Sequence, residues 1–499
     1  MLFTAFEFVF LFLPATFLGF MLLRRVGDIA GALWLIAASL FFYAFWNAAY
    51  LWLLVPSILV NYALGRALAR QTAGTAKKLL LAAGVATNLG VLAWFKYAGF
   101  LAANLGLLTG WDLALGTIVL PLGISFITFQ KIAYLVDAYR GHARDPSFVR
   151  FALFVSFFPQ LVAGPIVHHA EIMPQLQPGR WKRATATAAA TGLSLFAIGM
   201  FKKVVLADGV APIANLAFGE AAQGLAPAPA AAWAGALAYT LQLYFDFSGY
   251  SDMACGLALL FGIRLPGNFY SPYKAASIID FWRRWHITLS RFLRDYLYIP
   301  LGGNRRGAAR RYANLLITMT LGGLWHGAGW TFVLWGVFHG SLLLLNHAWR
   351  GWTGGRWRLP APLSIALTFL VVLFGWVLFR AESFAAALLM IEALLGLDGS
   401  AAGGTYAPAA PEWLRIATLL AAVWALPNTV QLMRRAFLLS NDTIRRHLAE
   451  EGVRPSGLDR IGRRLTWRPT IAWAALAALC FGLGLMPTRP RIEFLYFQF

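Results

Sequence analysis

Charged residues are scarce in this chain, and their scarcity excludes a soluble enzyme. They make up 13% of its 499 residues, whereas a soluble domain carries about 25%. Hydrophobic residues supply 59% of the chain, and its mean hydropathy is +0.63. Apolar runs of about 20 residues recur, and each is long enough for one helical crossing of a membrane. The composition therefore predicts an all-α integral membrane protein.

Cysteine is nearly absent as well. The two cysteines, Cys255 and Cys480, both lie in apolar stretches. Two isolated cysteines indicate neither a disulfide framework nor a cysteine-based metal site. We therefore expect that the protein holds no metal ion and no bound cofactor.

Acidic residues are outnumbered, because 21 Asp and Glu stand against 42 Lys and Arg, giving a formal net charge of +21. Nucleic acid is one partner that such a balance suggests. The basic residues, however, cluster in short loops between apolar runs, as is typical of cytoplasmic loops. Two such loops contain Arg180, Lys182 and Arg183, and the arginines of 434–468. We therefore expect no nucleic acid; the partners should be membrane lipids and a polyanionic cytosolic substrate such as a CoA nucleotide.

The N-terminus lacks the positive region and the clear cleavage site of a signal peptide. We therefore interpret residues 3–23 as a retained membrane span. The chain also lacks an internal repeat, which weighs against the transporter folds that are built from inverted repeats.

The apolar segments divide one membrane domain into three parts. Residues 1–116 hold the N-terminal spans, 117–350 a catalytic core and 351–499 the C-terminal spans. The whole pattern predicts about 11–12 crossings. The predicted spans and helices are 3–23, 29–47, 50–68, 79–100, 185–206, 229–262, 330–349, 362–380, 384–396, 412–430 and 470–487. Two prolines predict an irregular or re-entrant piece at 157–166, and residues 209–228 are expected to form a loop.

One apolar run contains a histidine between two pairs of glycines. From Leu321 to Trp330 it has the sequence LGGLWHGAGW, with His326 at its centre. Glycine weakens a helix, and irregular backbone at membrane depth is tolerated only beside protein or a water-filled cavity. The run therefore predicts a broken helix with His326 at the break, facing a cavity; a kinked helix whose histidine only hydrogen-bonds a neighbour is the alternative. A rise of about 15 Å from Tyr312 to Leu321 places the break near the middle of the membrane.

Residues 263–311 are rich in arginine and carry a helical apolar stripe. The stripe consists of Phe281, Trp285, Leu289, Phe292 and Tyr296. Its spacings of three and four residues predict one amphipathic helix at the inner membrane surface. His286 lies on the flank of this stripe. The arginines of 283–306 and the glycine loop 300–307 suit the phosphates of CoA, although positive-inside topology explains the arginines equally well.

Three further polar residues lie inside apolar segments. Asp246 and Asp252 belong to the segment 229–262, where buried charges are normally paired or line a cavity. We favour structural ion pairs with nearby arginines for both, because a membrane penalises unpaired charge. His339, in the span 330–349, is expected to be a satisfied histidine between helices.

Five motifs carry a resemblance to a known family. They are Tyr244–Ala254, Asn268–Tyr273, Asp280–Ser290, Leu297–Asn304 and Gly322–Gly327. Together they resemble the membrane-bound O-acyltransferase (MBOAT) family, in the bacterial branch that includes the membrane component of alginate O-acetylase. The resemblance covers most of the chain and implies an MBOAT-type bundle with re-entrant or broken helices around a central tunnel. The family's invariant histidine falls on His326, and its second polar position falls on His286.

The resemblance also implies an activity. The protein would take acetyl groups from a cytosolic donor, acetyl-CoA, and deliver them to an extracytoplasmic polysaccharide, either alginate or a similar exopolysaccharide. An extracytoplasmic acetyltransferase would be its partner protein, and its location would be the bacterial inner membrane. Peptidoglycan and teichoic acid are the acceptors of other branches. A transporter or flippase that forms no bonds is the alternative from a different class.

Each expected site residue has a role within this resemblance. His326 would be the general base that takes the proton of an acceptor hydroxyl as it attacks the thioester, and burial would keep it neutral. His286 would orient the donor or stabilise the oxyanion. Trp282, Trp285 and Trp325 would wall the tunnel, although ordinary core packing explains each of them as well. The other expected substrate contacts are Ser290, Asn304, Arg283, Arg284 and Arg305.

Overall fold

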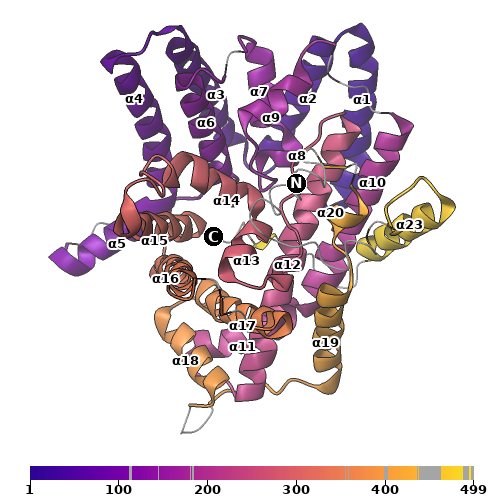
Figure 1. Cartoon of the computed structure of the whole chain (residues 1–499). Helices are drawn as coiled ribbons and strands as arrows, with labels where there is room; N and C mark the ends of the chain where they lie inside the picture. Colours follow the sequence, from indigo (N-terminus) through magenta and orange to yellow (C-terminus); the bar gives the residue numbers. More distant parts are fainter. Residues whose placement is uncertain are drawn as a thin grey trace.

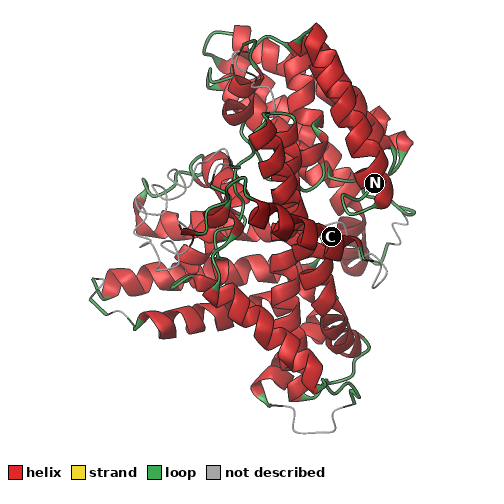
Figure 2. Cartoon of the chain, turned by 90° about the vertical axis from the view of Figure 1, so that its right-hand side faces the viewer, coloured by secondary structure: helices red, strands yellow, loops and turns green. Residues whose placement is uncertain are grey.

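Helices account for all the regular secondary structure in the described part of this computed structural model (Figure 2). The structure describes residues 1–499 except 112–114, 144, 180, 182–184, 355, 358, 398–402, 435, 438–461, 463, 487–493 and 496–499. The predicted all-α fold is therefore confirmed. The predicted basic loop at Arg180, Lys182 and Arg183, and most of the loop 434–468, lie outside the described residues.

The N-terminal helices gather at one end of the molecule (Figure 1). They are η1 (Glu7–Phe12), α1 (Leu13–Val26), α2 (Asp28–Ala44), η2 (Ala48–Tyr50), α3 (Leu51–Arg70), α4 (Thr75–Leu92), η3 (Ala93–Tyr97) and α5 (Ala98–Thr109). Helix α4, the π-helical turn η3 and α5 follow one another without a break. The apolar runs predicted in this part therefore all form helices.

The next elements are mostly buried and partly irregular. They are α6 (Ile124–Tyr139), α7 (Phe148–Ser156), α8 (Phe158–Leu161), α9 (His169–Ile172) and η4 (Met173–Leu176). After the four residues of α8 the chain runs as turns and extended backbone to α9. The irregular piece predicted at 157–166 is therefore confirmed.

Helix α12 (Pro229–Leu260) runs through the centre of the molecule, and nearly all its side chains are buried (Figure 1). It is one continuous helix of 32 residues, so the predicted segment 229–262 forms a single helix. Beside it lies α10 (Ala186–Phe201). A Cβ on Gly199 of α10 would lie 2.6 Å from the carbonyl oxygen of Gly249, so glycine permits this close crossing.

Helix α10 continues through the π-helical turn η5 (Lys202–Ala207) into α11 (Asp208–Ala222). The prediction of a loop at 209–228 is therefore wrong for residues up to 222. Alanines with high helix propensity dominate this stretch, and Pro212 removes only one backbone hydrogen bond from a helix that is already formed.

Lysines of η5 hold the two aspartates of α12. The Nζ atom of Lys203 lies 2.7 Å from carboxylate oxygens of both Asp208 and Asp246, and that of Lys202 lies 2.8 Å from Asp252. The predicted ion pairs of Asp246 and Asp252 are therefore confirmed. The expected partner was wrong, because α10 and η5 run along α12 and bring lysines, not arginines, to the carboxylates.

The remaining helices are η6 (Pro272–Lys274), α13 (Ile278–Arg284), α14 (Ile287–Leu293), η7 (Arg294–Tyr298), α15 (Gly307–His326), α16 (Trp330–Trp352), α17 (Ala361–Arg380), α18 (Phe384–Leu395), α19 (Ala410–Ala425), α20 (Thr429–Leu432) and α23 (Ile471–Leu485). Among them, α17, α18 and α19 pack directly on α12. Helices α17 and α18 lie at the end opposite to α1–α4 (Figure 1).

Within the described residues, six helical stretches are long and apolar enough to cross a membrane. They are Glu7–Val26, Ala48–Arg70, Thr75–Thr109, Ala186–Ala222, Trp330–Trp352 and Ala361–Arg380. Three shorter apolar helices are Asp28–Ala44, Phe384–Leu395 and Ile471–Leu485. An integral membrane protein is thus confirmed. The total of 11–12 crossings, the central tunnel and the division into three parts stay predictions.

Candidate active site

His326 is the last residue of α15, and the chain then leaves the helix for three residues. Gly327 has extended backbone with φ −157°, and α16 starts at Trp330. The predicted helix break at His326 is therefore confirmed.

Gly322 and Gly323 have a different role from the one predicted, because both remain inside α15. A Cβ on Gly323 would overlap the carbonyl oxygen of Phe332 and lie 2.9 Å from the Cα atom of Gly336. Glycine here lets α15 and α16 pack closely on either side of the break. Helix α15 also begins at Gly307, and its 20 residues rise about 30 Å. Its length therefore no longer places the break at mid-membrane.

Three aromatic rings surround the imidazole of His326. Its ring centroid lies 4.9 Å from that of Trp325, 5.2 Å from that of Trp335 and 5.1 Å from that of Phe379. Only 4% of the residue is exposed. Burial among apolar rings is costly for a charged imidazolium, so this environment favours the neutral form that a general base requires.

Two residues of η3 hold the end of α15, and the sequence analysis missed both. Lys96 donates hydrogen bonds to the carbonyl oxygens of Trp325 (2.6 Å) and His326 (3.0 Å), and the Tyr97 hydroxyl donates to that of Leu324 (2.9 Å). The last carbonyls of a helix have no partner within the helix and attract cations. A signal was present, because Lys96 is a single cation within the apolar run 79–100.

His286 lies at a second break, between α13 and α14. Its backbone is left-handed (φ 44°, ψ 54°), which is costly for a residue other than glycine. The prediction of one continuous amphipathic helix is therefore wrong. The reason is pairing with a distant segment, since Tyr270 N–H donates to Arg284 O (2.9 Å) and Ile287 N–H donates to Asn268 O (3.0 Å).

The fold brings His286 and His326 to the same indole. The ring centroid of His286 lies 6.2 Å from that of Trp325, whose ring lies next to His326 in turn. The ring of Phe247 from α12 lies edge-on to His286 with centroids 4.6 Å apart. Two histidines forty residues apart in the sequence thus share one buried aromatic environment.

The three tryptophans that were predicted to wall a tunnel lie in two layers of aromatic side chains. Trp325 contacts both histidines, whereas Trp282 packs on Trp335 with ring centroids 5.7 Å apart. Trp285 lies farther back, against Trp376 at 4.8 Å. These contacts fit a wall around His326, and they fit core packing equally well for Trp285.

His339 lies within the same aromatic cluster, 4.7 Å from Trp335 between ring centroids, and is fully buried. Among the described residues neither of its ring nitrogens has a hydrogen-bond partner. The expectation of a satisfied interhelical histidine is therefore wrong, because contacts with aromatic rings hold His339 in the described part of the chain.

The residues that were expected to contact the substrate differ in exposure and in partners. Arg284 is buried and its Nε lies 2.7 Å from Asp280, so a phosphate would have to compete with this ion pair.

The other expected substrate contacts are half-buried or exposed. Arg283 is half-buried, and Arg305 is exposed on the loop after η7. Asn304 is exposed beside Arg305 and accepts a hydrogen bond from the Tyr298 hydroxyl. Half-buried Ser290 donates to the Trp285 carbonyl oxygen at 3.5 Å. Substrate contact by these residues stays a prediction.

Comparison with known proteins gives one consistent result. The profile of the MBOAT, membrane-bound O-acyltransferase family, matches residues 25–381. The chain is 44% identical to the peptidoglycan O-acetyltransferase of Helicobacter pylori over 79% of each chain. It is also 44% identical to the probable alginate O-acetylase AlgI of Pseudomonas aeruginosa, over 79% of this chain and 75% of that protein. The teichoic acid D-alanyltransferase of Bacillus subtilis is 28% identical over 53% of this chain and 69% of that protein.

Proposed function

Because the chain belongs to the membrane-bound O-acyltransferase family, we propose that this O-acyltransferase transfers acetyl groups from cytosolic acetyl-CoA to hydroxyl groups of an extracytoplasmic polysaccharide. The observation that carries the proposal is the arrangement of His326 and His286 around Trp325. A buried base at a helix break is the group that transfer to a hydroxyl requires.

His326 acts as the general base in this proposal. Its imidazole takes the proton of an acceptor hydroxyl while the hydroxyl oxygen attacks the thioester carbonyl carbon. The oxyanion intermediate then collapses, the bond from carbon to sulfur breaks, and CoA leaves as a thiol after it takes up the proton. General-base catalysis typically contributes about 10²–10⁴-fold, so positioning of the two substrates and stabilisation of the oxyanion must supply the rest.

The end of α15 is held firmly enough for this role. Lys96 and Tyr97 fix its last three carbonyl groups, and Gly323 lets α16 pack against it. A base must lie within hydrogen-bond reach of the proton that it removes, so small displacements of His326 would slow the reaction.

The acceptor is proposed to be alginate or a similar exopolysaccharide. Relatives at 42–44% identity include several named as probable alginate O-acetylases. Peptidoglycan is the second candidate, because the Helicobacter pylori relative named for it is equally similar. Teichoic acid D-alanylation has less support, since the relative named for it is 28% identical over about half of this chain.

The proposal includes a location and a partner. The enzyme would lie in the bacterial inner membrane, where cytosolic acetyl-CoA and an external polymer are reached from opposite sides. An extracytoplasmic acetyltransferase would complete delivery to the polysaccharide. Deletion of this chain, followed by analysis of alginate and peptidoglycan for acetyl esters and of teichoic acid for D-alanyl esters, distinguishes the three acceptors.

Replacement of His326 tests the chemistry. We expect His326→Ala to lower acetylation of the polymer about 10²–10⁴-fold while membrane abundance stays normal. His347→Ala is the matched control, because this half-buried histidine lies near the far end of α16. Retained acetylation in His326→Ala would remove this residue from the chemistry. Purified protein that consumes no acetyl-CoA in the presence of acceptor would instead support a transporter or flippase.

A further inference from the structure

The side-chain oxygen of Asn268 faces three hydrogen-bonding groups. Its Oδ1 atom lies 3.3 Å from the backbone nitrogen of Thr288, 3.0 Å from the Thr288 hydroxyl and 3.1 Å from Nδ1 of His286. Asn268 therefore contacts one of the two histidines directly, although it is 18 residues away in sequence.

The donors of this network can be assigned from chemistry. A backbone N–H can only donate, so the atom of Asn268 that faces Thr288 is the oxygen and not the amide nitrogen. The Thr288 hydroxyl accepts a hydrogen bond from Ile166 N–H at 3.0 Å, so its own proton points to Asn268. The amide nitrogen of Asn268 is directed to the Ser251 hydroxyl at 3.3 Å. The proton between Asn268 and His286 must therefore come from Nδ1.

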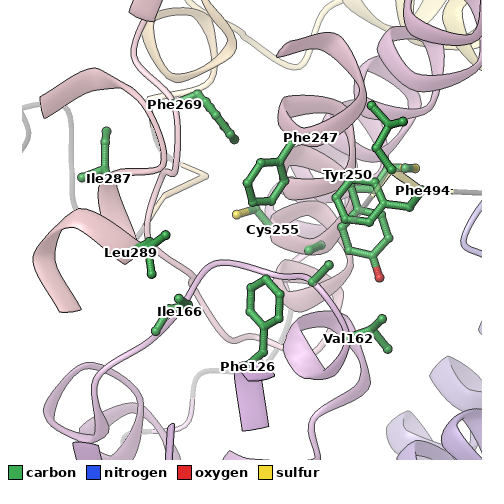
Figure 3. Close-up of a cluster of buried hydrophobic side chains, with 14 of the residues drawn as sticks. Phe126, Val162, Ile166, Phe247, Tyr250, Cys255, Phe269, Ile287, Leu289 and Phe494 are labelled. Atoms are coloured by element: carbon green, nitrogen blue, oxygen red, sulfur yellow. The ribbon is translucent and has the colours of Figure 1, made fainter. Parts of the chain in front are cut away.

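Burial makes this assignment stable. Asn268 is 3% exposed, Thr288 1% and His286 0%. Figure 3 shows part of the buried apolar cluster, including Phe269 and Ile287, which adjoin Asn268 and His286 in sequence. It also shows Ile166, whose N–H donates to Thr288, and Phe247, whose ring contacts His286. If the proton moved to Nε2, two buried lone pairs would face each other, which a site shielded from water penalises.

We propose that Asn268 is a positioning residue that holds His286 in the tautomer with its proton on Nδ1. Nε2 then carries the lone pair, so His286 accepts a hydrogen bond from a substrate N–H or O–H group and does not donate one to an oxyanion. Of the two roles expected for His286, orientation of a substrate is retained and stabilisation of the oxyanion is excluded. The catalytic consequence rests on the proposed acyl transfer; the tautomer itself does not.

Nitrogen-15 NMR of the purified full-length protein, labelled at histidine, measures the tautomer directly. The His286 signals are assigned by their loss in His286→Gln. We expect Nδ1 to be protonated and Nε2 to be unprotonated at neutral pH, because Asn268 accepts from Nδ1. An Nε2-protonated ring would overturn the proposal. This measurement needs no turnover, so it gives an answer even if acetyl-CoA is not the donor.

Asn268→Asp provides the functional readout. A carboxylate opposite the Nδ1 proton favours imidazolium, so the acid limb of the pH–rate profile should move to higher pH by about one unit or more. Across Trp325, the imidazole of His286 faces one other titratable group, the imidazole of His326, which also contributes to the pH–rate profile. Asn268→Leu removes the acceptor, so His286 is no longer held in place and turnover should fall by up to about 10²-fold without such a shift.

Asn88→Asp is the matched control. Asn88 is a buried asparagine paired with Asn61 between α3 and α4, and it makes no contact with His286 in the described residues. We expect the acid limb of the pH–rate profile of Asn88→Asp to stay at the wild-type pH. An unmoved limb in Asn268→Asp would overturn the positioning role, whereas wild-type protein inactive with every acyl donor would overturn the proposed function alone.

Discussion

Two regions of the molecule bury polar side chains almost completely but surround them with different groups. Around α12, Lys203 lies between the carboxylates of Asp208 and Asp246, with 2.7 Å to each. Around the end of α15, His326 is enclosed by rings at 4.9–5.2 Å. The first region is charged and paired, whereas the second consists of an imidazole among aromatic side chains.

This difference in surroundings distinguishes polar groups that stabilise the fold from polar groups that can transfer a proton. A carboxylate held by a buried ammonium group cannot take up a proton without breaking the pair and leaving a buried charge. A neutral imidazole can take up and release a proton during a reaction. Asn268 connects the two regions, because its oxygen contacts His286 and its nitrogen is directed to Ser251, the neighbour of Asp252 in α12. The helix that carries the ion-paired Asp252 therefore also contributes Ser251, which contacts the asparagine that faces His286.

Lys203→Met should give the largest effect, and that effect should be on stability. Two buried carboxylates would lose their cation, and breaking a buried pair costs about 3–5 kcal/mol. We expect strongly reduced membrane abundance and a lower midpoint of thermal unfolding in detergent. Lys78→Met, at an exposed position of α4, is the control. If Lys203→Met accumulated normally but lost activity, as expected of His326→Ala, the contrast between the two regions would fail.

Lys96→Met should have an intermediate effect, mainly on kcat. It removes the cation that holds the Trp325 and His326 carbonyls, so we expect kcat to fall about 10–100-fold while KM for acetyl-CoA stays nearly constant. Tyr97→Phe removes one hydrogen bond, to the Leu324 carbonyl oxygen, and should lower kcat by less than Lys96→Met does. Steady-state kinetics with the purified enzyme measures both. Partial rescue by Lys96→Arg supports positioning of His326, and a change in KM alone argues against it.

Arg305→Ala should have the smallest effect, on substrate binding. This arginine is exposed, so its attraction for CoA phosphates is weakened by water and salt. We expect KM for acetyl-CoA to rise about two- to fivefold at low ionic strength, with less change at high salt and little change in Arg305→Lys. If Arg305→Ala and the wild-type enzyme had the same KM at every salt concentration, membrane topology would remain as the role of this arginine.

Much of the fold and one half of the site could be predicted from local sequence. Apolar runs predicted most of the helices, and the cost of burying charge predicted that Asp246 and Asp252 are paired. His326 stood out because a histidine beside Gly327 interrupts an apolar run, and the helix does end there. Each of these signals depends on residues within a few helical turns of one another. Over such short distances, hydrophobic periodicity and the cost of burying a charge can be deduced from the sequence.

The other half of the site was decided by contacts between distant segments. A stripe with helical spacing predicted one helix through His286, yet Asn268 and Tyr270 pair with the backbone on either side of this histidine and break the helix. Lys96 reaches a helix end 229 residues further along the chain. Local sequence was therefore enough to predict a membrane bundle with an interrupted helix at His326. The groups that surround this histidine became known only from the fold, because hydrogen bonds between remote segments leave no local periodicity in the sequence.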